Sequence, residues 1–516
     1  MTKTVCILTS GIGSRMHQLG KLYNKAILPY KNKALISHIF NQFSNSTQFI
    51  ISLGYKSEQV VSYIKLAHPE KLKSIHFVHV KNYNGLGSSP GLSLLQCKKY
   101  LMRPFIFTSC DTILDGKVNF NSKINWAAVS KVEKKISGDY CNFEIIRNKI
   151  INYSEKKKYT RFNQKSFTGI CHIKDYKLFW KGISDNQNKV KNLQISHGLK
   201  NLIENKSLYE KKIKWKDFGT FEKYLNLINE KKNFDFSKTN EQIYIIKNKK
   251  IIKFFTDINV INQRVSKSKM NKIVFPITKK MGNFYSYDFV NGKTLYEKNN
   301  LQIFKKFLIF LEKDLWRKKV KRKKITELCR NFYKKKTLKR IGIFKKKYKN
   351  FKIKKVNNIS VKPFEFINKR IWHTKIFEGT PTFIHGDLQF DNVIYGKGKF
   401  KLIDWRHEFD KSIEVGDLYY DLAKLYGGIL LNYKHIKKNK FSFKEKNGNI
   451  KIIFKKDTFK LLKYYEKYIE DRKIDLAKIK ILTGIIYLNM APLHNFPFDK
   501  FLYSLGILCL NKELKK

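Results

Sequence analysis

The sequence predicts an α/β protein, with an N-terminal domain built on a mostly parallel sheet and a second domain that mixes strands and helices. Three observations indicate this. The chain has 516 residues, too many for one ordinary hydrophobic core. Short β-rich runs alternate with helical stretches from Thr4 to about Asn240. The polar, unpatterned stretch Glu230–Asn240 then precedes a new series of strand-like runs.

The first half of the chain shows alternating strand and helix patterns. Helical spacing of apolar residues predicts helices at Leu35–Phe43 and Glu58–Leu66. Because parallel strands need long crossovers, this alternation favours βαβ units. Short apolar runs predict buried strands at Val5–Leu8, Phe49–Leu53, Ile75–Val80 and Phe105–Thr108.

The second half has a different pattern, and we place the two domains at residues 1–235 and 241–516. The Lys-rich region 301–370 predicts exposed helices. A loop-rich stretch, 380–404, precedes the final helices. Strands are predicted at Gln242–Ile246, Ile251–Phe255 and Phe284–Phe289.

Positive charge dominates the composition, with 106 Lys and Arg residues against 41 Asp and Glu, a net charge of +65. Such an excess is typical of proteins that bind nucleic acid or anionic membranes. Here the lysines are spread from end to end together with many Asn and Ile residues, as a general compositional drift would produce, and no nucleic-acid motif accompanies them. We therefore expect a solvated basic surface, whose field also favours phosphate ligands.

The 7 cysteines are scattered and include no CxxC pair, so neither a disulfide framework nor a structural zinc site is expected. We interpret them as buried thiols. No run of about 18 uncharged apolar residues occurs, and the first residues lead into a strand-like segment rather than a signal-peptide core. The sequence therefore predicts a cytoplasmic protein without a membrane span.

A glycine-containing loop, Gly11–Met16, follows the first predicted strand. Glycines let a backbone approach a ligand closely, successive amides can cradle phosphate oxygens, and Arg15 adds a forked cation. A tight strand-to-helix turn with no ligand remains an alternative, since the third glycine of the dinucleotide fingerprint is missing.

Further motifs follow this loop: Asn24–Pro29, Lys33–His38, Leu53–Tyr55, Asn82–Tyr83, Gly87–Ser89, Ser93–Leu95, Ser109–Asp111, Thr168–Ile170 and Trp215–Thr220. In this order they resemble the sugar-1-phosphate and phosphocholine nucleotidyltransferases, over roughly residues 1–235. The resemblance implies a Rossmann-like nucleotidyltransferase domain. In such enzymes a phosphate oxygen attacks the α-phosphorus of a nucleoside triphosphate, so catalysis needs positioning and charge neutralisation.

The resemblance also implies roles for individual residues. Arg15 would hold the leaving phosphates, Lys25 would neutralise charge where the substrates meet, and Asp111 and Asp217 would share a Mg²⁺ ion. The nucleotide would lie against the backbone of Leu8–Gly11 and the Gly87–Ser89 turn. The nucleotide-binding set is Gly11, Gly13, Ser14, Arg15 and Ser88.

Structural alternatives stay open for these residues. Both aspartates could cap a helix or turn after their strands, and Lys25 could be one more surface lysine. Asn24 stands where the family usually has proline, which alters loop stiffness but leaves the Lys25 amine available. Glu155–Lys156 matches a substrate-contacting motif of the family, but Lys157 replaces its proline.

A second constellation begins at Ile384–Tyr395, where Asp387 and Asn392 are five positions apart, as in the catalytic loop of protein kinases. There the Asp receives the hydroxyl proton and the Asn binds Mg²⁺. A predicted hairpin, 393–403, then delivers Asp404 beside Asn392, where it can complete the metal site. The alternative is a hairpin loop that carries polar residues by chance.

This segment and Gly416–Ala423 resemble the aminoglycoside phosphotransferase and choline kinase family. The resemblance spans about residues 241–516 but is sharp only at 383–425. It implies a two-lobed protein-kinase-like (α+β) domain, with a small lobe at about 241–295 and a helical remainder at 296–516. We expect His385 to buttress the loop, Asp391 to form a turn, and Asp417 and Asp421 to organise the helix start and the loop.

The sequence pattern of the nucleotide-binding lobe is weak. Lys253 is our candidate for the lysine that steadies the ATP phosphates. A plain exposed strand lysine is the alternative. The kinase lysine normally pairs with a helix glutamate, but Asp257 is the only acid between Lys253 and Tyr287. Either the pairing differs or another lysine has this role.

Together the two halves predict a bifunctional enzyme. The kinase would phosphorylate a small hydroxyl-bearing acceptor with ATP, and the transferase would couple that phosphate to a nucleoside monophosphate from CTP or another triphosphate, with Mg²⁺ at both sites. The resemblance favours a CDP-choline-like product for surface polysaccharide or lipid modification. The alternatives are an anomeric sugar kinase fused to a sugar-1-phosphate uridylyl- or guanylyltransferase, and a basic nucleic-acid-binding protein with degenerate enzyme folds. The oligomeric state stays open.

Overall fold

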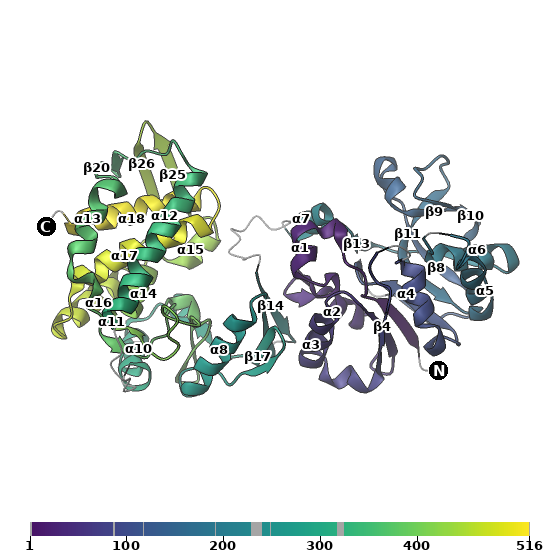
Figure 1. Ribbon diagram of the computed structural model, residues 1–516, viewed down its shortest axis with the longest axis horizontal. Coiled ribbons are helices and arrows are strands. Elements are labelled where there is room, and N and C mark those ends of the chain that lie inside the picture. Colours follow the sequence, from purple (N-terminus) through teal and green to yellow (C-terminus); the bar gives the residue numbers. More distant parts are fainter. Residues whose placement is uncertain are drawn as a thin grey trace. The chain divides into compact units, whose positions relative to one another are not determined.

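The computed structural model describes residues 3–85, 88–116, 118–190, 192–228, 240–247, 249–316 and 325–514. These residues group into two compact units (Figure 1). Within the described ranges, one unit holds 3–228, 240–256 and 281–286, and the other holds 257–280 and 287–514. Residues 230–239 of the predicted linker lie outside the described part of the chain.

A large mixed sheet forms the centre of the first unit. Its order is β5-β4-β1-β6-β11-β8-β12-β10-β9. The strands are β1 (Thr4–Leu8), β4 (Gln48–Leu53), β5 (Ile75–His79), β6 (Phe105–Ser109), β8 (Trp126–Ser130), β9 (Cys141–Ile146), β10 (Lys149–Glu155), β11 (Gln164–Ile173) and β12 (Leu208–Lys212). The four strands predicted from the sequence are β1, β4, β5 and β6.

The two faces of this sheet pack against different helices. Val5 and Ile7 of β1 point into one apolar cluster with α2 (Leu35–Phe40) and α3 (Ser57–Ala67). Cys6 points into another cluster with α4 (Pro90–Gln96), α5 (Tyr176–Asn186) and α6 (Ile195–Asn205). Successive side chains of a strand alternate between faces, so a strand buried on both sides must be apolar throughout.

The sheet is less parallel than the sequence predicts. β5, β4, β1 and β6 run parallel, whereas β11 is antiparallel to β6, β8 and β9. One reason is the turn between β9 and β10, where Arg147 and Asn148 both have positive φ, of 48° and 65°. Two such residues make a tight hairpin turn, which forces its strands to be antiparallel.

A hairpin that follows the linker in sequence belongs to the core of the first unit. It consists of β14 (Glu241–Ile246) and β15 (Lys250–Phe255). Tyr244 of β14 is completely buried, packs on Tyr63 of α3, and donates its hydroxyl hydrogen to the Ile27 carbonyl oxygen at 2.7 Å. Phe254 of β15 packs on Tyr23. The hairpin therefore covers apolar surface that α2 and α3 leave open.

The second unit is mainly helical, and a bundle of α12, α14, α17 and α18 lies at its centre (Figure 1). Its helices are α8 (Ile258–Met270), α9 (Leu295–Lys298), α10 (Leu301–Phe310), α11 (Ile325–Cys329), α12 (Lys336–Lys347), α13 (Phe364–His373), α14 (Leu418–Leu430), α15 (Tyr433–Lys437), α16 (Phe459–Asp471), α17 (Leu476–Met490) and α18 (Phe498–Leu514). The predicted hairpin is β22 (Val393–Gly396) paired with β23 (Lys399–Leu402).

Some expectations need correction in detail. The Lys-rich region is not uniformly exposed, because Phe304, Tyr333 and Phe344 of its helices are buried. Among the free cysteines, Cys141 and Cys509 are only partly buried. The segment Leu476–Leu493, which is α17 with the turn after it, is long and apolar enough to cross a membrane. However, 61% of this segment is buried inside the fold.

The position of Tyr244 generates a stability prediction. Replacing Tyr244 with Ala should destabilise the first unit by ~3–5 kcal/mol, because a buried aromatic ring is lost and the cavity relaxes only partly. Hydrogen exchange of the full-length chain, followed peptide by peptide, should show faster exchange in β1 and β4 and no change in α17. Phe162→Ala is the control: this side chain is 95% exposed, so its effect should stay within ~0.5 kcal/mol. Unchanged protection of β1 and β4 in Tyr244→Ala would contradict the placement of the hairpin.

Candidate active sites

The glycine loop follows β1 in the first unit. Gly13 has a φ of 68°, in the left-handed region that favours glycine. A Cβ atom at Gly11 would meet no heavy atom within 4 Å, so the backbone there borders open space. The side chains of Ser14 and Arg15 are exposed. The loop thus presents backbone and a cation to solvent, as a phosphate-binding loop requires.

Asn24 fixes the segment that carries Lys25. It is 1% exposed and donates its side-chain amide hydrogens to the carbonyl oxygens of Thr9 and Tyr55, at 2.8 and 2.7 Å. Its Oδ1 accepts a hydrogen bond from the Ala26 amide at 2.9 Å. The residue that replaces proline therefore ties together the ends of β1 and β4 and the turn that begins at Lys25.

Lys25 and Asp111 form an ion pair. The Lys25 ammonium donates to Asp111 Oδ2 at 2.9 Å and to the Gly219 carbonyl oxygen at 3.0 Å. Burial alone would raise the pKa of Asp111, but Lys25, a hydrogen bond from Ser109 and the charge of Arg15 hold this pKa below its ordinary value. Lys25 is therefore not simply a surface lysine, and Asp111 is held as a carboxylate.

Strand pairing brings Asp217 to the same end of the sheet as Asp111. In the antiparallel pair of β7 (Thr112–Leu114) and β13 (Trp215–Asp217), Asp217 lies opposite Thr112. The Phe218 amide also donates to the Asp111 carbonyl oxygen at 2.9 Å. Residues far apart in sequence thus become neighbours.

The partners of Asp217 include two residues that sequence reasoning missed. Its Oδ2 accepts hydrogen bonds from the Tyr140 hydroxyl at 2.6 Å and the Lys223 ammonium at 2.8 Å. Its Oδ1 accepts from the Gly219 amide at 2.7 Å, which is the capping role considered as an alternative. Lys223 lies two residues into α7 (Phe221–Ile228). The short spacing between Lys223 and Asp217, across a turn, could have indicated this contact from the sequence. Nothing in the sequence indicated Tyr140.

Gly169 illustrates why the Thr168–Ile170 motif needs glycine. Its φ is 84°, and a Cβ atom there would lie 2.5 Å from Ser109 Oγ. Ser109 Oγ and Thr112 Oγ1 are 2.9 Å apart, and Thr112 donates to the Thr168 carbonyl oxygen at 2.6 Å. A larger residue at position 169 would displace the strand end that carries Asp111.

Ser88 is partly buried, and its hydroxyl donates to the Gly85 carbonyl oxygen at 2.9 Å.

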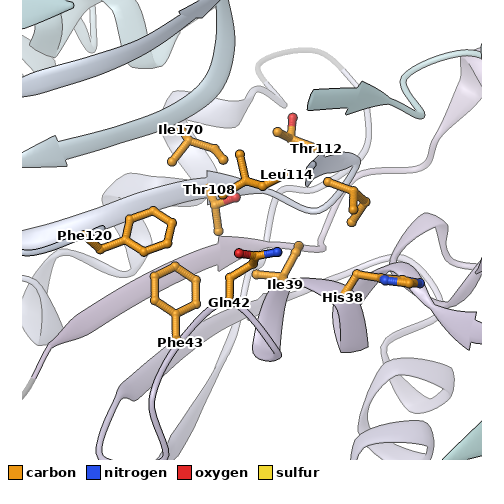
Figure 2. Close-up of a pocket in the computed structure, with 10 residues that line it drawn as sticks. His38, Ile39, Gln42, Phe43, Thr108, Thr112, Leu114, Phe120 and Ile170 are labelled. Carbon is orange, nitrogen blue, oxygen red and sulfur yellow. The ribbon is translucent and has the colours of Figure 1, made fainter. Parts of the chain in front are cut away.

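A small cavity lies nearby, between α2 and strands β6 and β7, with the Phe43 and Phe120 rings facing each other at one end (Figure 2). Its volume is about 10 Å³. That is about the space needed by a single water molecule. The cavity is therefore a packing gap and not a nucleotide site.

The second constellation lies in the other unit, where its members converge. Asn392 donates its side-chain amide hydrogens to the Asp387 carbonyl oxygen at 2.8 Å and to Asp387 Oδ2 at 3.4 Å. The Ile403 amide donates to the Asn392 carbonyl oxygen at 2.9 Å, so Asp404 follows directly beside Asn392. Asp404 has a φ of 58°. This conformation is strained for a residue with a side chain, and such strain clusters at functional sites.

Lys424 of α14 pairs with Asp387, with its ammonium 2.7 Å from Oδ1. Burial opposes a charged Lys424, but Asp387 and nearby tyrosines hold its pKa above the ordinary value. Lys424 was not identified from the sequence. It lies one helical turn after Asp421, so helical spacing from that residue was the available signal.

Asp421 fixes the backbone of the loop that carries Asp387. Its completely buried carboxylate accepts hydrogen bonds from the backbone amides of His385 at 2.8 Å and Gly386 at 2.7 Å. Burial raises the pKa of Asp421 to about 6, and these hydrogen bonds limit the rise. The expected loop-organising role of Asp421 is thereby confirmed.

His385 and Asp417 also have the expected structural roles. Burial lowers the pKa of His385 to about 3, so its ring is neutral. The ring contacts the Ile403 carbonyl oxygen at 2.9 Å and accepts from the Asp387 amide at 3.1 Å, which buttresses the loop. Asp417 caps α14 by accepting from the Tyr419 amide at 3.2 Å.

Lys253 lies on β15, in the first unit. It is 1% exposed, so the alternative of a plain exposed strand lysine is wrong. Asp257, the acid nearest to it in sequence, accepts from the Asn259 amide at the start of α8.

The donor sets can be compared with what Mg²⁺ requires. In the described part of the chain, no three His, Cys, Asp or Glu side chains cluster as a complete metal site. Mg²⁺ needs only one or two carboxylates when substrate phosphates and water supply the other ligands. Asp111 and Asp217 fit this pattern, although Lys25 and Lys223 now neutralise them. Asn392 and Asp404 fit it as well, since Asn392 uses its amide nitrogen for Asp387 and has its amide oxygen to offer.

Comparison with known proteins concerns the N-terminal part of the chain. It is similar to the bifunctional protein GlmU of Methanococcus maripaludis, with 25% identity over 226 residues, covering 41% of this chain and 50% of that protein. The bifunctional protein GlmU of Methanococcus vannielii gives 25% identity over 225 residues. The chain thus spans about half the length of these curated relatives. No family model matches the chain.

Part of the chain is also similar to solved structures of nucleotidyltransferases. A putative glucose-1-phosphate thymidylyltransferase from Bacillus anthracis has 18% identity and a TM-score of 0.39, over 46% of this chain and 98% of that one. CTP:phosphocholine cytidylyltransferase from Streptococcus pneumoniae has 16% identity and a TM-score of 0.37, over 44% of this chain and 99% of that one.

Proposed function

We propose that the protein is a bifunctional enzyme in which the second unit phosphorylates a small hydroxyl compound and the first unit activates the product with a nucleotide. In the first step the acceptor hydroxyl oxygen attacks the γ-phosphorus of ATP, the bond to the β–γ bridging oxygen breaks, and ADP leaves. In the second step an oxygen of the new phosphate attacks the α-phosphorus of CTP or another triphosphate, and pyrophosphate leaves. The sequence resemblance favours a CDP-choline-like product.

The observation that carries the first-unit proposal is the contact between Lys25 and Asp111 beside an open glycine loop. Nucleotidyl transfer concentrates phosphate charge at one point, and an ammonium held by a carboxylate and a carbonyl oxygen is pre-oriented to meet it. Arg15, exposed on the same loop, would contact the leaving pyrophosphate. Mg²⁺ held by Asp111 and Asp217 would supply further neutralisation. The similarity to GlmU over this region supports the same assignment.

The second-unit proposal depends on the convergence of Asp387, Asn392 and Asp404. Asp387 would accept the proton of the acceptor hydroxyl, and the Lys424 ammonium lies 2.7 Å from its Oδ1. Asn392 and Asp404 would hold Mg²⁺, which neutralises the ATP phosphates. Lys253, a buried lysine on β15, stays a candidate for the ATP phosphates.

Reciprocal substitutions test the two activities. Asp111→Asn should lower nucleotidyl transfer to a supplied phosphorylated acceptor by at least ~100-fold, because a carboxylate needed for charge and metal binding is lost. ATP-dependent phosphorylation by the same variant should be unchanged. Asp387→Asn should do the reverse. Both activities are measured by mass spectrometry of the products formed from ATP, CTP, UTP and GTP with choline, ethanolamine, glycerol and hexoses.

The acceptor panel also separates the remaining alternatives. Hexose 1-phosphates as the only products would replace the choline assignment with the sugar kinase alternative. Simultaneous loss of both activities in either variant would contradict independent sites. Salt-sensitive RNA or DNA binding that persists in both variants, with no turnover in the wild type, would favour the nucleic-acid-binding alternative.

The buried carboxylate of Asp421 generates a separate prediction. Asp421→Ala leaves two loop amides without their acceptor, so Asp387 should lose its position and kcat for phosphorylation should fall by at least ~10-fold. Asp391→Ala is the control, since Asp391 pairs with Lys437, whose side chain is 49% exposed, and such an ion pair is worth ~0.5 kcal/mol. Circular dichroism should confirm that both variants fold. Full activity of a folded Asp421→Ala variant would exclude this positioning role.

A further inference from the structure

An open basic cavity lies at the start of α12 in the second unit. It is lined by Lys335, Lys336, Lys339, Arg340 and Ile343, and its volume is about 510 Å³. That is within the range of small-molecule binding sites. Four of the five lining side chains carry a positive charge. A concave surface concentrates the field of such charges more strongly than a flat one.

Within the described ranges, none of Lys335, Lys336, Lys339 and Arg340 forms an ion pair. Burial, followed by the charges of Arg406, Lys424 and Arg340, holds the pKa of Lys336 well below its ordinary value, and the charge of Asp387 opposes this shift. Burial and Arg406 likewise lower the pKa of Arg340. The cations of this cavity thus repel one another, Asp387 opposes that repulsion, and an anionic ligand would relieve it further.

Packing connects this cavity to the catalytic loop. The Phe332 ring has the Lys336 ammonium 4.1 Å from its centroid and the Arg406 guanidinium carbon 4.7 Å from it. The Arg406 amide donates to the His385 carbonyl oxygen at 2.9 Å. A Cβ atom at Gly386, the residue before Asp387, would lie 2.6 Å from Arg406 Cβ. The cavity cations and Asp387 therefore belong to one packed cluster.

We propose that this cavity binds the phosphoryl acceptor and that the acceptor is an anion, a hydroxyl compound that also carries a carboxylate or phosphate group. This rests on the proposed kinase function and replaces choline, which is a cation, as the expected acceptor. The anionic group would contact Arg340 and Lys336, while the hydroxyl reaches Asp387. Arg340 suits this role because its planar fork can bind two oxygens of one carboxylate or phosphate.

A solvated basic helix is the plainest alternative, since lysine is abundant everywhere in this chain. Surface lysines normally keep their ammonium groups in water and apart from one another. Here Lys336 and Arg340 are partly buried, and the charge of Arg406 acts on both. This arrangement costs free energy without a ligand, and it occurs beside Asp387.

Binding measurements with the full-length chain test the proposal without relying on turnover. The probes are three pairs: glycerate and glycerol for the carboxylate, glycerol 3-phosphate and glycerol for the phosphate, and glucose 6-phosphate and glucose for a larger phosphate ester. Choline is the cationic probe. Calorimetry at low ionic strength should show that at least one anion binds ~10-fold or more tightly than its uncharged counterpart and choline.

Variants assign that binding to the cavity. Arg340→Gln should weaken anion binding by ~10-fold, and Arg340→Lys should restore only part of it, because lysine keeps the charge but lacks the fork. Lys346→Gln, an exposed position on the same helix outside the cavity, should change nothing. In the kinase assay, Arg340→Gln should raise the KM of the anionic acceptor and leave the KM of ATP unchanged. Asp387→Asn should keep anion binding.

Each contrary outcome has a definite meaning. Equal binding of charged and uncharged probes, or turnover of uncharged or cationic acceptors alone, would overturn the inference and leave the kinase proposal standing. A raised KM for ATP in Arg340→Gln would also overturn it, because the cavity would then serve the nucleotide. Arg340-dependent anion binding with no ATP consumption for any acceptor would support the anion site and refute the phosphotransfer function.

Discussion

The ammonium group of Lys25 joins three segments that are distant in sequence: the turn after Asn24, the strand end at Asp111, and the Gly219 carbonyl oxygen. Each contact alone is modest, but together they fix the end of the sheet where the glycine loop opens. The pairing of β7 with β13 depends on the same geometry, because it places Asp217 next to the segment that Lys25 contacts. In the first unit, the contacts of Lys25 therefore neutralise Asp111 and also support the register of β7 and β13. Substitution of Lys25 would disturb both.

In the second unit, buried polar groups fix the loop that carries Asp387. A loop that holds a carboxylate toward solvent must still satisfy those of its backbone amides that are buried. Asp421 supplies the acceptor for two of those amides, and the neutral ring of His385 supplies further support. Lys424 then balances the charge of Asp387. The loop conformation is thus specified by polar contacts that would be costly to leave unpaired.

Much of this could be predicted from the sequence, and the failures have physical reasons. Strands β1, β4, β5 and β6 were predictable because residues buried on both faces make continuous apolar runs. The spacing of Asp387, Asn392 and Asp404 was readable because a hairpin places them together. Tyr140 could not be found, since its contact with Asp217 comes from tertiary folding alone, whereas the short spacing between Asp217 and Lys223 could have indicated that pair. The basic cavity was hidden by composition: with 106 Lys and Arg residues, no single cluster of lysines is distinctive until folding shows which ones share a concave surface.

The β14–β15 hairpin has a consequence for the order in which the protein can mature on the ribosome. Domains commonly fold as units while the chain is being made, beginning from the N-terminus. Here the apolar surface of α3 is completed by Tyr244, Phe254 and Phe284, which leave the ribosome only after the linker. The first unit must therefore wait, partly uncovered, until translation has passed Ser286, and during that interval its unfinished surface is open to chaperones or to association with neighbouring nascent chains.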